Sequence, residues 1–291
     1  MPDSGGNKTR KLLITGGSGF LGRRTAAYFS SLGHQVYAPS HKELDITDDS
    51  ALDRWFSENL PDGVIHTAAV SDTGVCQKNP EWSETINVTG TVNLAKICKK
   101  YRTKLVSCSS DQVYFGSTEA GPHKEAEHLS PGNVYGCQKL RAEELCLEIL
   151  PKTVCLRLSW MYARDRAEGE KGDFLSNLKA ALTDPSLPLS FPVHDRRGLT
   201  DVADVIKNLP KALELPGGAW NVGSANCLTT FDTVRILLKN HPAPERLTPN
   251  EEAFRDHPRD LTMDQTKLNA AGIFFPTTLE ALQSAFREEM L

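Results

Sequence analysis

Residues 11–22, K-L-L-I-T-G-G-S-G-F-L-G, join a short apolar run to three spaced glycines. The apolar run predicts a buried strand at 11–15, and the apolar spacing that follows predicts a helix from Phe20 to Leu32, closed by Gly33. Glycines in such a turn permit a close backbone approach, and a helix N-terminus offers N–H groups and a positive dipole end to a pyrophosphate. The stretch therefore predicts a dinucleotide-binding turn, with cofactor contacts from Gly16, Ser18, Gly19, Phe20, Leu21 and Gly22.

Strands and helices alternate beyond this turn. Apolar runs bounded by turn residues predict strands at 35–38, 63–69, 104–108 and 153–158, and helical spacing predicts helices at 48–60, about 81–101 and about 133–148. Such an order is typical of a mostly parallel sheet covered by helices on both faces. We therefore expect an α/β fold with a doubly wound, Rossmann-type parallel sheet, to which residues 218–222 add a further strand.

The pattern becomes looser after Trp160, where a charged stretch and many prolines interrupt it. We expect a dinucleotide-binding Rossmann domain at residues 1–160, with residues 200–223 returning to it. Residues 161–199 and 224–291 would form a smaller C-terminal substrate-binding lobe over the carboxyl edge of the sheet.

The composition excludes several classes of protein. Thirty-three Lys and Arg stand against 37 Asp and Glu, for a net charge of −4 without a strongly basic block, so a nucleic-acid polymer is not an expected partner. No apolar run approaches the roughly 20 residues of a membrane span. Seven cysteines are scattered without a C-x-x-C pair, and eight histidines show no metal-ligand spacing. We expect a protein of the reducing cytoplasm with no metal site and no membrane contact.

The turn after the second predicted strand carries Ser40, His41 and Lys42 in place of the acidic residue that often binds the ribose 2′-hydroxyl of NAD. A hydroxyl, an imidazole and an ammonium suit a 2′-phosphate better than a carboxylate does, so the sequence favours NADP over NAD. A solvated turn is the alternative. Asp45, in L-D-I-T-D, would contact the adenine or cap the following loop.

Tyr135 and Lys139, in Y-G-C-Q-K, are four residues apart in a predicted helix, so their side chains leave the same face. A nearby ammonium favours the tyrosinate and lowers the pKa of a tyrosine from about 10 toward neutral pH. The phenol then becomes a competent proton donor. The strand at 104–108 leads into S-C-S-S-D-Q-V-Y, which presents Ser110 for a hydrogen bond to the same substrate oxygen. These three side chains predict a hydride-transfer site.

Several motifs together resemble the extended short-chain dehydrogenase/reductases: the glycine turn, H-T-A-A at 66–69, Asn87 in I-N-V-T-G-T, Ser110 and the Y-x-x-x-K pair. Within that superfamily, L-D-I-T-D, S-S-D-Q-V-Y, L-R-L-S-W-M-Y at 156–162 and P-R-D-L-T-M-D at 258–264 are most similar to the dTDP-4-dehydrorhamnose reductase group. The resemblance covers most of the chain. It implies NAD(P)H-dependent reduction of a nucleotide-linked 4-keto sugar, with NADPH favoured.

The resemblance implies a role for each matching residue. Tyr135 would protonate the new alkoxide, Lys139 would tune Tyr135 and bind the ribose, and Ser110 would orient the ketone. Asn87 would hold its helix open around a proton-relay water; the alternative is a position on a polar helix face. Trp160 would border the sugar; the alternative is a buried core aromatic. Further cofactor contacts would come from Asp45, Ile46, Ala68, Ala69 and Ser109, and substrate contacts from Asp111, Gln112, Trp160, Arg197 and Arg259.

Several residues depart from the pattern of these reductases. The group usually has T-D-Y-V-F and an acidic residue in the loop that follows the H-T-A-A strand, whereas this chain has S-D-Q-V-Y and G-V-C-Q at 74–77. His257 stands where an arginine commonly precedes the proline. The cations left for a diphosphate are Arg196, Arg197 and Arg259. These departures leave the sugar unidentified.

Two other functions stay open. A nucleotide-sugar epimerase of the same superfamily uses the same Tyr and Lys pair on a retained NAD, whereas a dehydratase needs a glutamate at the position of Gln112. The family also includes a regulatory subunit of methionine adenosyltransferase, which binds a dinucleotide and a partner enzyme. A non-catalytic NADP-binding role is therefore the second alternative. Homodimers are common in the superfamily, and no apolar stripe of this sequence identifies such a surface.

Overall fold

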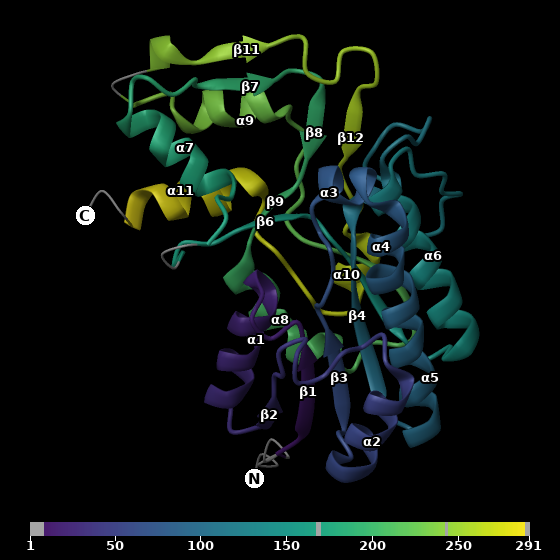
Figure 1. The fold of residues 1–291 in the computed structure, drawn as a ribbon. Coiled ribbons are helices and arrows are strands. Elements are labelled where there is room, and N and C mark those ends of the chain that lie inside the picture. The colour runs from purple at the N-terminus through teal and green to yellow at the C-terminus, as the bar shows by residue number, and fades with distance from the viewer. Residues whose placement is uncertain (1–8, 167–169, 242–243, 289–291) are drawn as a thin grey trace. The chain divides into compact units, whose positions relative to one another are not determined.

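A computed structural model describes residues 9–166, 170–241 and 244–288 of the chain (Figure 1). Its contacts divide the chain into two compact units. The first unit takes the described residues up to Cys108, with residues 141–155 and 212–218. The second takes residues 109–140, 156–211 and the described residues from Ala219 onward. Each unit has a hydrophobic core of its own.

A six-stranded sheet has the strand order β10-β5-β4-β3-β1-β2. Its strands are β1 (Lys11–Thr15), β2 (Gln35–Tyr37), β3 (Gly63–His66), β4 (Lys104–Ser110), β5 (Val154–Leu158) and β10 (Gly218–Val222). In the first unit β1 pairs in parallel with β2 and β3, and β3 pairs in parallel with β4. The predicted Rossmann-type parallel sheet is confirmed, including the added strand. β3 ends before the predicted residue 69 because its partner β1 ends at Thr15, which pairs with His66.

Helices cover the strands of the first unit. Those predicted from apolar spacing are α1 (Phe20–Ser31), α2 (Asp49–Asn59), α5 (Thr91–Tyr101) and α6 (Val134–Ile149), of which only residues 141–149 belong to the first unit. The α1 helix contacts β1 and β2, and α2 packs against α5 (Figure 1). Leu13, Val64 and Leu105, from three neighbouring strands, are fully buried in one core with Phe56 of α2 and Leu94 of α5. Burial of such a side chain contributes roughly 1.5–3 kcal/mol, so this core holds the strands in register beneath the helices.

The helix predicted at about 81–101 is interrupted. The structure has α4 (Pro80–Glu84), a π-helical turn (Thr85–Gly90) and then α5, and a short helix α3 (Thr73–Lys78) precedes them. A Cβ atom on Gly90 would lie 2.7 Å from the Ile46 side chain, so this glycine lets the π-turn approach the loop that carries Ile46. A π-turn inserts an extra residue into a helix and is frequent at functional sites. The spacing of apolar residues does not reveal it.

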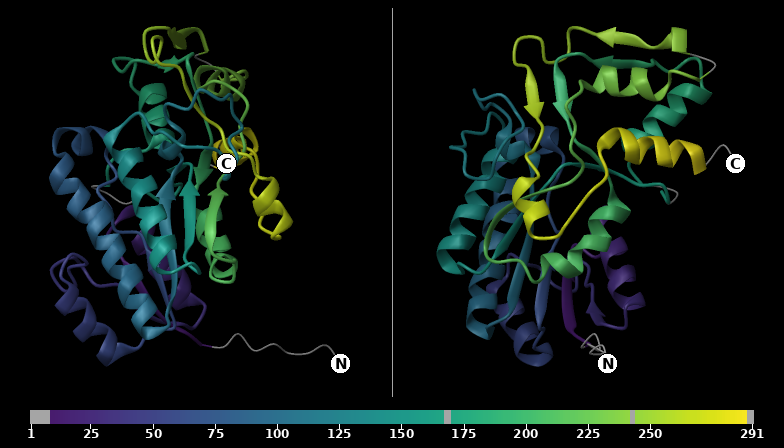
Figure 2. Two further views of the ribbon diagram at one scale, coloured as in Figure 1. Left: turned by 90° about the vertical axis from the view of Figure 1, so that its right-hand side faces the viewer. Right: turned by 180° about the vertical axis from the view of Figure 1, so that it is seen from behind.

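Within the described residues, the second unit contains small two-stranded parallel sheets: β6 with β9, β7 with β11, and β8 with β12. Their strands are β6 (Trp160–Tyr162), β7 (Ser190–Pro192), β8 (Asp195–Arg197), β9 (Leu199–Asp201), β11 (Thr248–Asn250) and β12 (Arg259–Leu261). The helices are α7 (Phe174–Thr183), α8 (Val202–Ala212), α9 (Thr230–Leu237), α10 (Thr266–Ala270) and α11 (Thr278–Glu288). The α9 helix packs against β7 and α11 against α9 (Figure 2). Tyr162, Leu178, Val234 and Leu282 join these elements in one core.

The cysteines are free thiols that differ in burial. Cys137 and Cys227 are exposed, whereas Cys98 and Cys146 lie fully buried in the core of the first unit. Burial in apolar surroundings disfavours a thiolate and raises the pKa of Cys98, and the neighbouring Cys146 adds to this shift.

We expect iodoacetamide to label the native protein at Cys137 and Cys227 and to leave Cys98 unlabelled, because a buried thiol of raised pKa is both inaccessible and protonated. Mass spectrometry of the digested protein measures the labelling. The same protein unfolded in urea is the control, in which all three thiols should react alike. Labelling of native Cys98 at the rate of Cys137 would contradict the packing described here.

Candidate active site

The glycine turn of the first unit is closed by backbone contacts. Gly16 has a φ of +70°, and a Cβ atom there would lie 2.7 Å from the backbone nitrogen of Ala68. A Cβ atom on Gly22 would overlap the carbonyl oxygen of Gly16. Helix α1 then begins at Phe20 with no side chain capping it and no acidic residue in its first turn. These features leave space and N–H donors for an anionic group at this helix end.

The turn after β2 carries the residues predicted to meet a 2′-phosphate. His41 and Lys42 are exposed. Ser40 is bound locally, because its backbone N–H and its hydroxyl both donate to the Glu43 carboxylate, at 2.7 and 2.8 Å. These bonds, the backbone bond first, lower the pKa of Glu43. Sequence reasoning missed Glu43, although S-H-K-E places an acidic residue in this turn, and the exposed His41 and Lys42 are the better candidates for a phosphate.

The loop that follows is held by its own side chains. The Asp45 carboxylate accepts from the backbone N–H and the hydroxyl of Thr47, at 2.8 Å each. The Asn93 amide donates to the carbonyl oxygen of Ile46 at 3.3 Å, and Ile46 is buried. Asp45 therefore caps this loop, which is one of the two roles predicted for it.

A buried chain of hydrogen bonds links β1, β3 and the π-turn. The Thr91 hydroxyl donates to the Asn87 carbonyl oxygen at 2.7 Å, so it accepts from Nε2 of His66 at 2.9 Å. Nδ1 of His66 lies at hydrogen-bond distance, 2.7 Å, from the Thr15 hydroxyl. The bond to Thr91 places a proton on Nε2 of His66. Sequence reasoning noted His66 only as part of H-T-A-A and missed this role.

The side chain of Asn87 fixes the loop after β3. Its Oδ1 accepts from the Val70 N–H at 2.8 Å, and its Nδ2 donates to the Val70 carbonyl oxygen at 3.1 Å. The Cys76 thiol donates to the same carbonyl oxygen at 3.2 Å. Asn87 is fully buried, so the alternative that placed it on a polar helix face is wrong. The relay water stays a prediction.

In the second unit, Tyr135 and Lys139 lie on consecutive turns of α6. They are 7% and 5% exposed, and the Lys139 ammonium lies 5.8 Å from the centre of the Tyr135 ring. The start of the helix is fixed by Asn133, whose Oδ1 accepts from the Gly136 N–H at 2.7 Å and whose Nδ2 donates to Oε1 of Gln112 at 3.0 Å. A Cβ atom on Gly136 would overlap the carbonyl oxygen of Gln112. The middle glycine of Y-G-C-Q-K thus lets α6 begin against residue 112.

Ser110 ends β4 and caps the 3-10 turn Asp111–Tyr114. Its Oγ accepts from the Gln112 N–H at 3.2 Å and donates to Oδ1 of Asp111 at 3.1 Å. Asp111 is buried and pairs through Oδ2 with Nη2 of Arg197 at 2.9 Å. The Arg197 guanidinium lies 4.8 Å from the centre of the Trp160 ring, which is 37% exposed. These predicted residues form one contact group, and the alternative of Trp160 as a buried core aromatic is wrong.

The other cations predicted for a diphosphate differ in exposure. Arg196 is exposed. Arg259 pairs through Nε with Oδ1 of the buried Asp195 at 2.6 Å, and its guanidinium lies 3.9 Å from the centre of the Phe254 ring. Ser109, predicted at the cofactor, has a buried hydroxyl with no hydrogen-bond partner among the residues that the structure describes.

Two further tyrosines of the second unit are poor proton donors. Burial raises the pKa of Tyr114 to about 12, although the Arg157 guanidinium, 2.9 Å from its hydroxyl, opposes the shift. Burial also raises the pKa of Tyr162, and the Asp201 carboxylate adds to the rise. A donor works best when its pKa lies near the working pH. Tyr135, with an ammonium beside it, is the better candidate.

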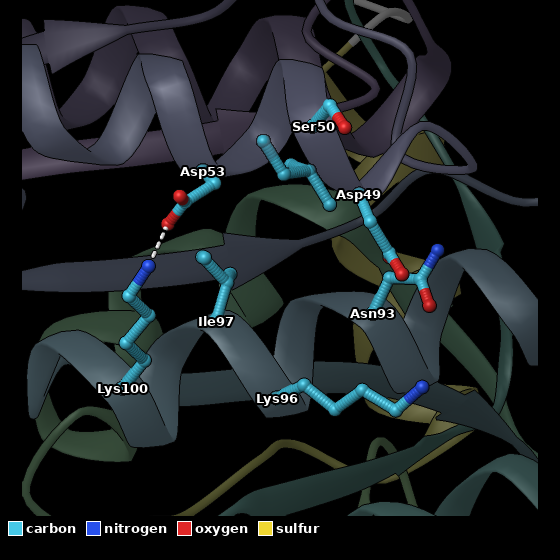
Figure 3. Close-up of a pocket in the computed structure, with 8 residues that line it drawn as sticks. Asp49, Ser50, Asp53, Asn93, Lys96, Ile97 and Lys100 are labelled. Carbon is cyan, nitrogen blue, oxygen red and sulfur yellow. Dashed lines mark hydrogen bonds and ion pairs between the residues drawn. The ribbon is translucent and has the colours of Figure 1, made fainter.

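A hollow of about 320 Å³ lies between α2 and α5 in the first unit (Figure 3). The Lys100 ammonium and the Asp53 carboxylate pair at 2.5 Å, and this hydrogen bond lowers the pKa of Asp53. The lining residues are Asp49, Ser50, Leu52, Asp53, Asn93, Lys96, Ile97 and Lys100. No residue predicted for the site is among them, so the hollow adds nothing to it.

The described residues contain no group of three or more His, Cys, Asp or Glu side chains placed to hold a metal ion. The helices of that part of the chain all lack the length or the apolar character needed to span a bilayer. The predicted absence of a metal stays a prediction.

Comparison with known protein families matches residues 10–290 to the RmlD substrate binding domain. The dTDP-4-dehydrorhamnose reductase of Streptomyces griseus is 30% identical over 274 residues, which cover 90% of this chain and 88% of that protein. The dTDP-4-dehydrorhamnose reductase of Aggregatibacter actinomycetemcomitans is 31% identical over 279 residues, which cover 90% of this chain and 92% of that protein. The match extends across both compact units.

Solved structures share the fold at lower identity. A dTDP-4-dehydrorhamnose reductase from Bacillus anthracis, in complex with NADP, has a TM-score of 0.80 at 22% identity and covers 96% of this chain and 98% of its own. A UDP-glucose 4-epimerase from Thermotoga maritima, with UDP-glucose, has a TM-score of 0.77 at 20% identity and covers 97% of this chain and 100% of its own. Both enzyme classes therefore use this architecture.

We expect Gly22→Ala to weaken dinucleotide binding by about tenfold or more, because the added methyl group would have to displace the Gly16 carbonyl, and overpacking of this kind costs roughly 1–3 kcal/mol. Fluorescence titration with NADPH measures the affinity. Gly33→Ala is the matched control: Gly33 has a φ of +82° with open space around it, so the change should lower the free energy of unfolding and leave the affinity unchanged. Equal NADPH affinity of Gly22→Ala and the unmodified protein would contradict dinucleotide binding at the glycine turn.

Proposed function

The chain belongs to the RmlD substrate binding domain family, and from this premise we propose that it reduces a nucleotide-linked 4-keto sugar with NADPH, as a dTDP-4-dehydrorhamnose reductase does. The observation that carries the proposal is the buried Lys139 ammonium 5.8 Å from the Tyr135 ring centre. Relatives that are 30% and 31% identical over most of the chain bear the name of this reductase, which supports an NAD(P)-dependent oxidoreductase of the short-chain dehydrogenase/reductase type.

The residues of the first unit suit a dinucleotide. Gly16 and Gly22 lack the side chains that would fill the turn, and the uncapped start of α1 offers N–H groups to a pyrophosphate. His41 and Lys42 are exposed and suit a 2′-phosphate, so NADPH is favoured over NADH. When bound, NADPH supplies the hydride.

The residues of the second unit supply the proton that the reduced carbonyl oxygen takes up. Tyr135 donates its phenolic proton to the carbonyl oxygen as the ketone becomes an alcohol, and the Lys139 ammonium stabilises the phenolate that remains. The Ser110 hydroxyl hydrogen-bonds the same oxygen and orients the ketone. Because Tyr135 and Lys139 are 7% and 5% exposed, water competes poorly for this proton.

The two domains predicted from the sequence bind different molecules in this proposal. Residues 1–160 with 200–223 bind NADPH, and residues 161–199 and 224–291 bind the nucleotide sugar. Trp160 is 37% exposed and offers an aromatic surface to a sugar ring, and the exposed Arg196 offers a cation to the diphosphate.

Tyr135→Phe should remove most of the turnover and leave NADPH binding intact, because phenylalanine keeps the ring and has no proton to donate. General acid catalysis contributes about 10²–10⁴-fold, so a loss of this size in kcat is expected. The assay follows the decrease in NADPH absorbance with dTDP-4-dehydrorhamnose and a panel of other 4-keto nucleotide sugars. Tyr28→Phe, on α1, is the matched control and should keep full turnover.

The same assay separates the alternatives. An epimerase would convert a nucleotide sugar without net consumption of NADPH. A non-catalytic NADP-binding subunit would bind NADPH without turnover of any 4-keto sugar, and Tyr135→Phe would then behave like the unmodified protein. Either result would overturn the proposed function.

A further inference from the structure

The single hydroxyl proton of Ser110 is already donated to another side chain, that of Asp111. Ser110 Oγ donates to the Asp111 carboxylate at 3.1 Å and accepts from the Gln112 N–H at 3.2 Å. A serine hydroxyl has one proton to donate and two lone pairs to accept with. A ketone oxygen that is to be held by Ser110 must therefore compete with the Asp111 carboxylate for this proton.

The strength of that competition depends on the charge of Asp111. A carboxylate is a stronger hydrogen-bond acceptor than a neutral carbonyl oxygen, and more so when it is buried and has no counter-charge. Asp111 is 2% exposed, and its other oxygen pairs with Nη2 of Arg197 at 2.9 Å. The guanidinium draws the negative charge of Asp111 toward Oδ2, and so it weakens the hold of Oδ1 on the Ser110 proton.

Arg197 is poorly placed to bind a diphosphate itself. Its side chain is only 10% exposed, and one of its terminal nitrogens is engaged by Asp111. Its Nε is buried and has no hydrogen-bond partner among the described residues, and its guanidinium lies against the Trp160 ring. A phosphate could reach it only by breaking the pair with Asp111, which would leave a buried carboxylate uncompensated.

We propose that Arg197 is a positioning residue for Ser110: by neutralising Asp111, its guanidinium leaves the Ser110 proton available to the carbonyl oxygen of the substrate. This inference rests on the proposed reduction of a 4-keto sugar. It replaces the role of diphosphate ligand that the sequence suggested for Arg197. Packing against Trp160 holds the guanidinium in place, so the aromatic ring and the hydroxyl belong to one connected group.

Kinetics of charge-neutral variants test this role. Arg197→Gln should lower kcat about tenfold with the KM for NADPH unchanged, because the uncompensated carboxylate then holds the Ser110 proton more tightly. Asp111→Asn added to Arg197→Gln should restore most of kcat, because the competing acceptor is then neutral. In a Ser110→Ala background, Arg197→Gln should have no further effect on kcat, because the residue through which it acts is gone.

Other roles give other results. A diphosphate ligand would raise the KM for the nucleotide sugar in Arg197→Gln, without rescue by Asp111→Asn, and this would overturn the inference. A purely structural ion pair would lower kcat equally with and without Ser110, which would overturn it as well. Arg164→Gln combined with Asp201→Asn is the matched control, since this second pair, at 2.6 Å in the same unit, does not include the Asp111 carboxylate that accepts from Ser110. It should change thermal stability and leave kcat unchanged.

A measurement without turnover separates this inference from the proposed function. Ser110→Cys, in a protein that also carries Cys137→Ser and Cys227→Ser, places a thiol beside Asp111. The pH dependence of its alkylation by iodoacetamide gives its pKa, which Arg197→Gln should raise by about one unit and the added Asp111→Asn should return to the starting value. If no 4-keto sugar is reduced, the proposed function fails, and this titration still tests the role of Arg197. An unchanged thiol pKa in Arg197→Gln would overturn the inference.

Discussion

Backbone crowding at Gly16 is the constraint on which the first unit depends. Gly16 lies in the left-handed region against Ala68, and Gly22 lies against the carbonyl oxygen of Gly16, so the end of β1, the start of α1 and the segment after β3 cannot shift independently. The hydrogen bonds from Thr15 through His66 to Thr91 extend this constraint to the π-turn. Each of these groups is removed from water and needs a partner, because an unsatisfied buried polar group costs free energy. The glycine turn and the π-turn therefore form one connected piece.

The second unit depends on a different constraint: its buried carboxylates are paired with arginine side chains. The ion pairs of Asp195 with Arg259 and of Asp201 with Arg164 involve carboxylates that are 2% and 4% exposed. A buried ion pair seldom stabilises a fold more than apolar residues of similar volume do, because desolvation offsets the Coulomb attraction. Burial alone therefore says little about why such a pair is present. The pair of Asp111 with Arg197 differs because one of its carboxylate oxygens also holds the Ser110 hydroxyl.

The sequence predicted those parts of the molecule that depend on local patterns, such as the regular spacing of apolar residues along a helix. Helix α1 was predictable because its apolar spacing ends at Gly33, whose φ of +82° suits a helix end. The Tyr135 and Lys139 pair was predictable because helix geometry alone brings residues four apart together. The π-turn at 85–90 was not, since one inserted residue barely alters the apolar spacing. The strands of the second unit, such as β8 with 3 residues, are too short to show alternation. The contact of Asp111 with Arg197 joins distant parts of the chain, and no local rule gives it.

Strand β8 shows how neighbouring residues of one type acquire separate roles. Successive side chains of a strand point to opposite sides, and here Arg197 is buried while Arg196 is exposed. The sequence R-R could not distinguish them, because the buried side of β8 is set by contacts with distant parts of the chain, such as that of Arg197 with Asp111. An exposed guanidinium keeps its donors for a phosphate, whereas a buried one must first abandon its carboxylate at a large desolvation cost. Of the two, Arg196 therefore suits recognition of a diphosphate, and Arg197 suits control of the proton on Ser110.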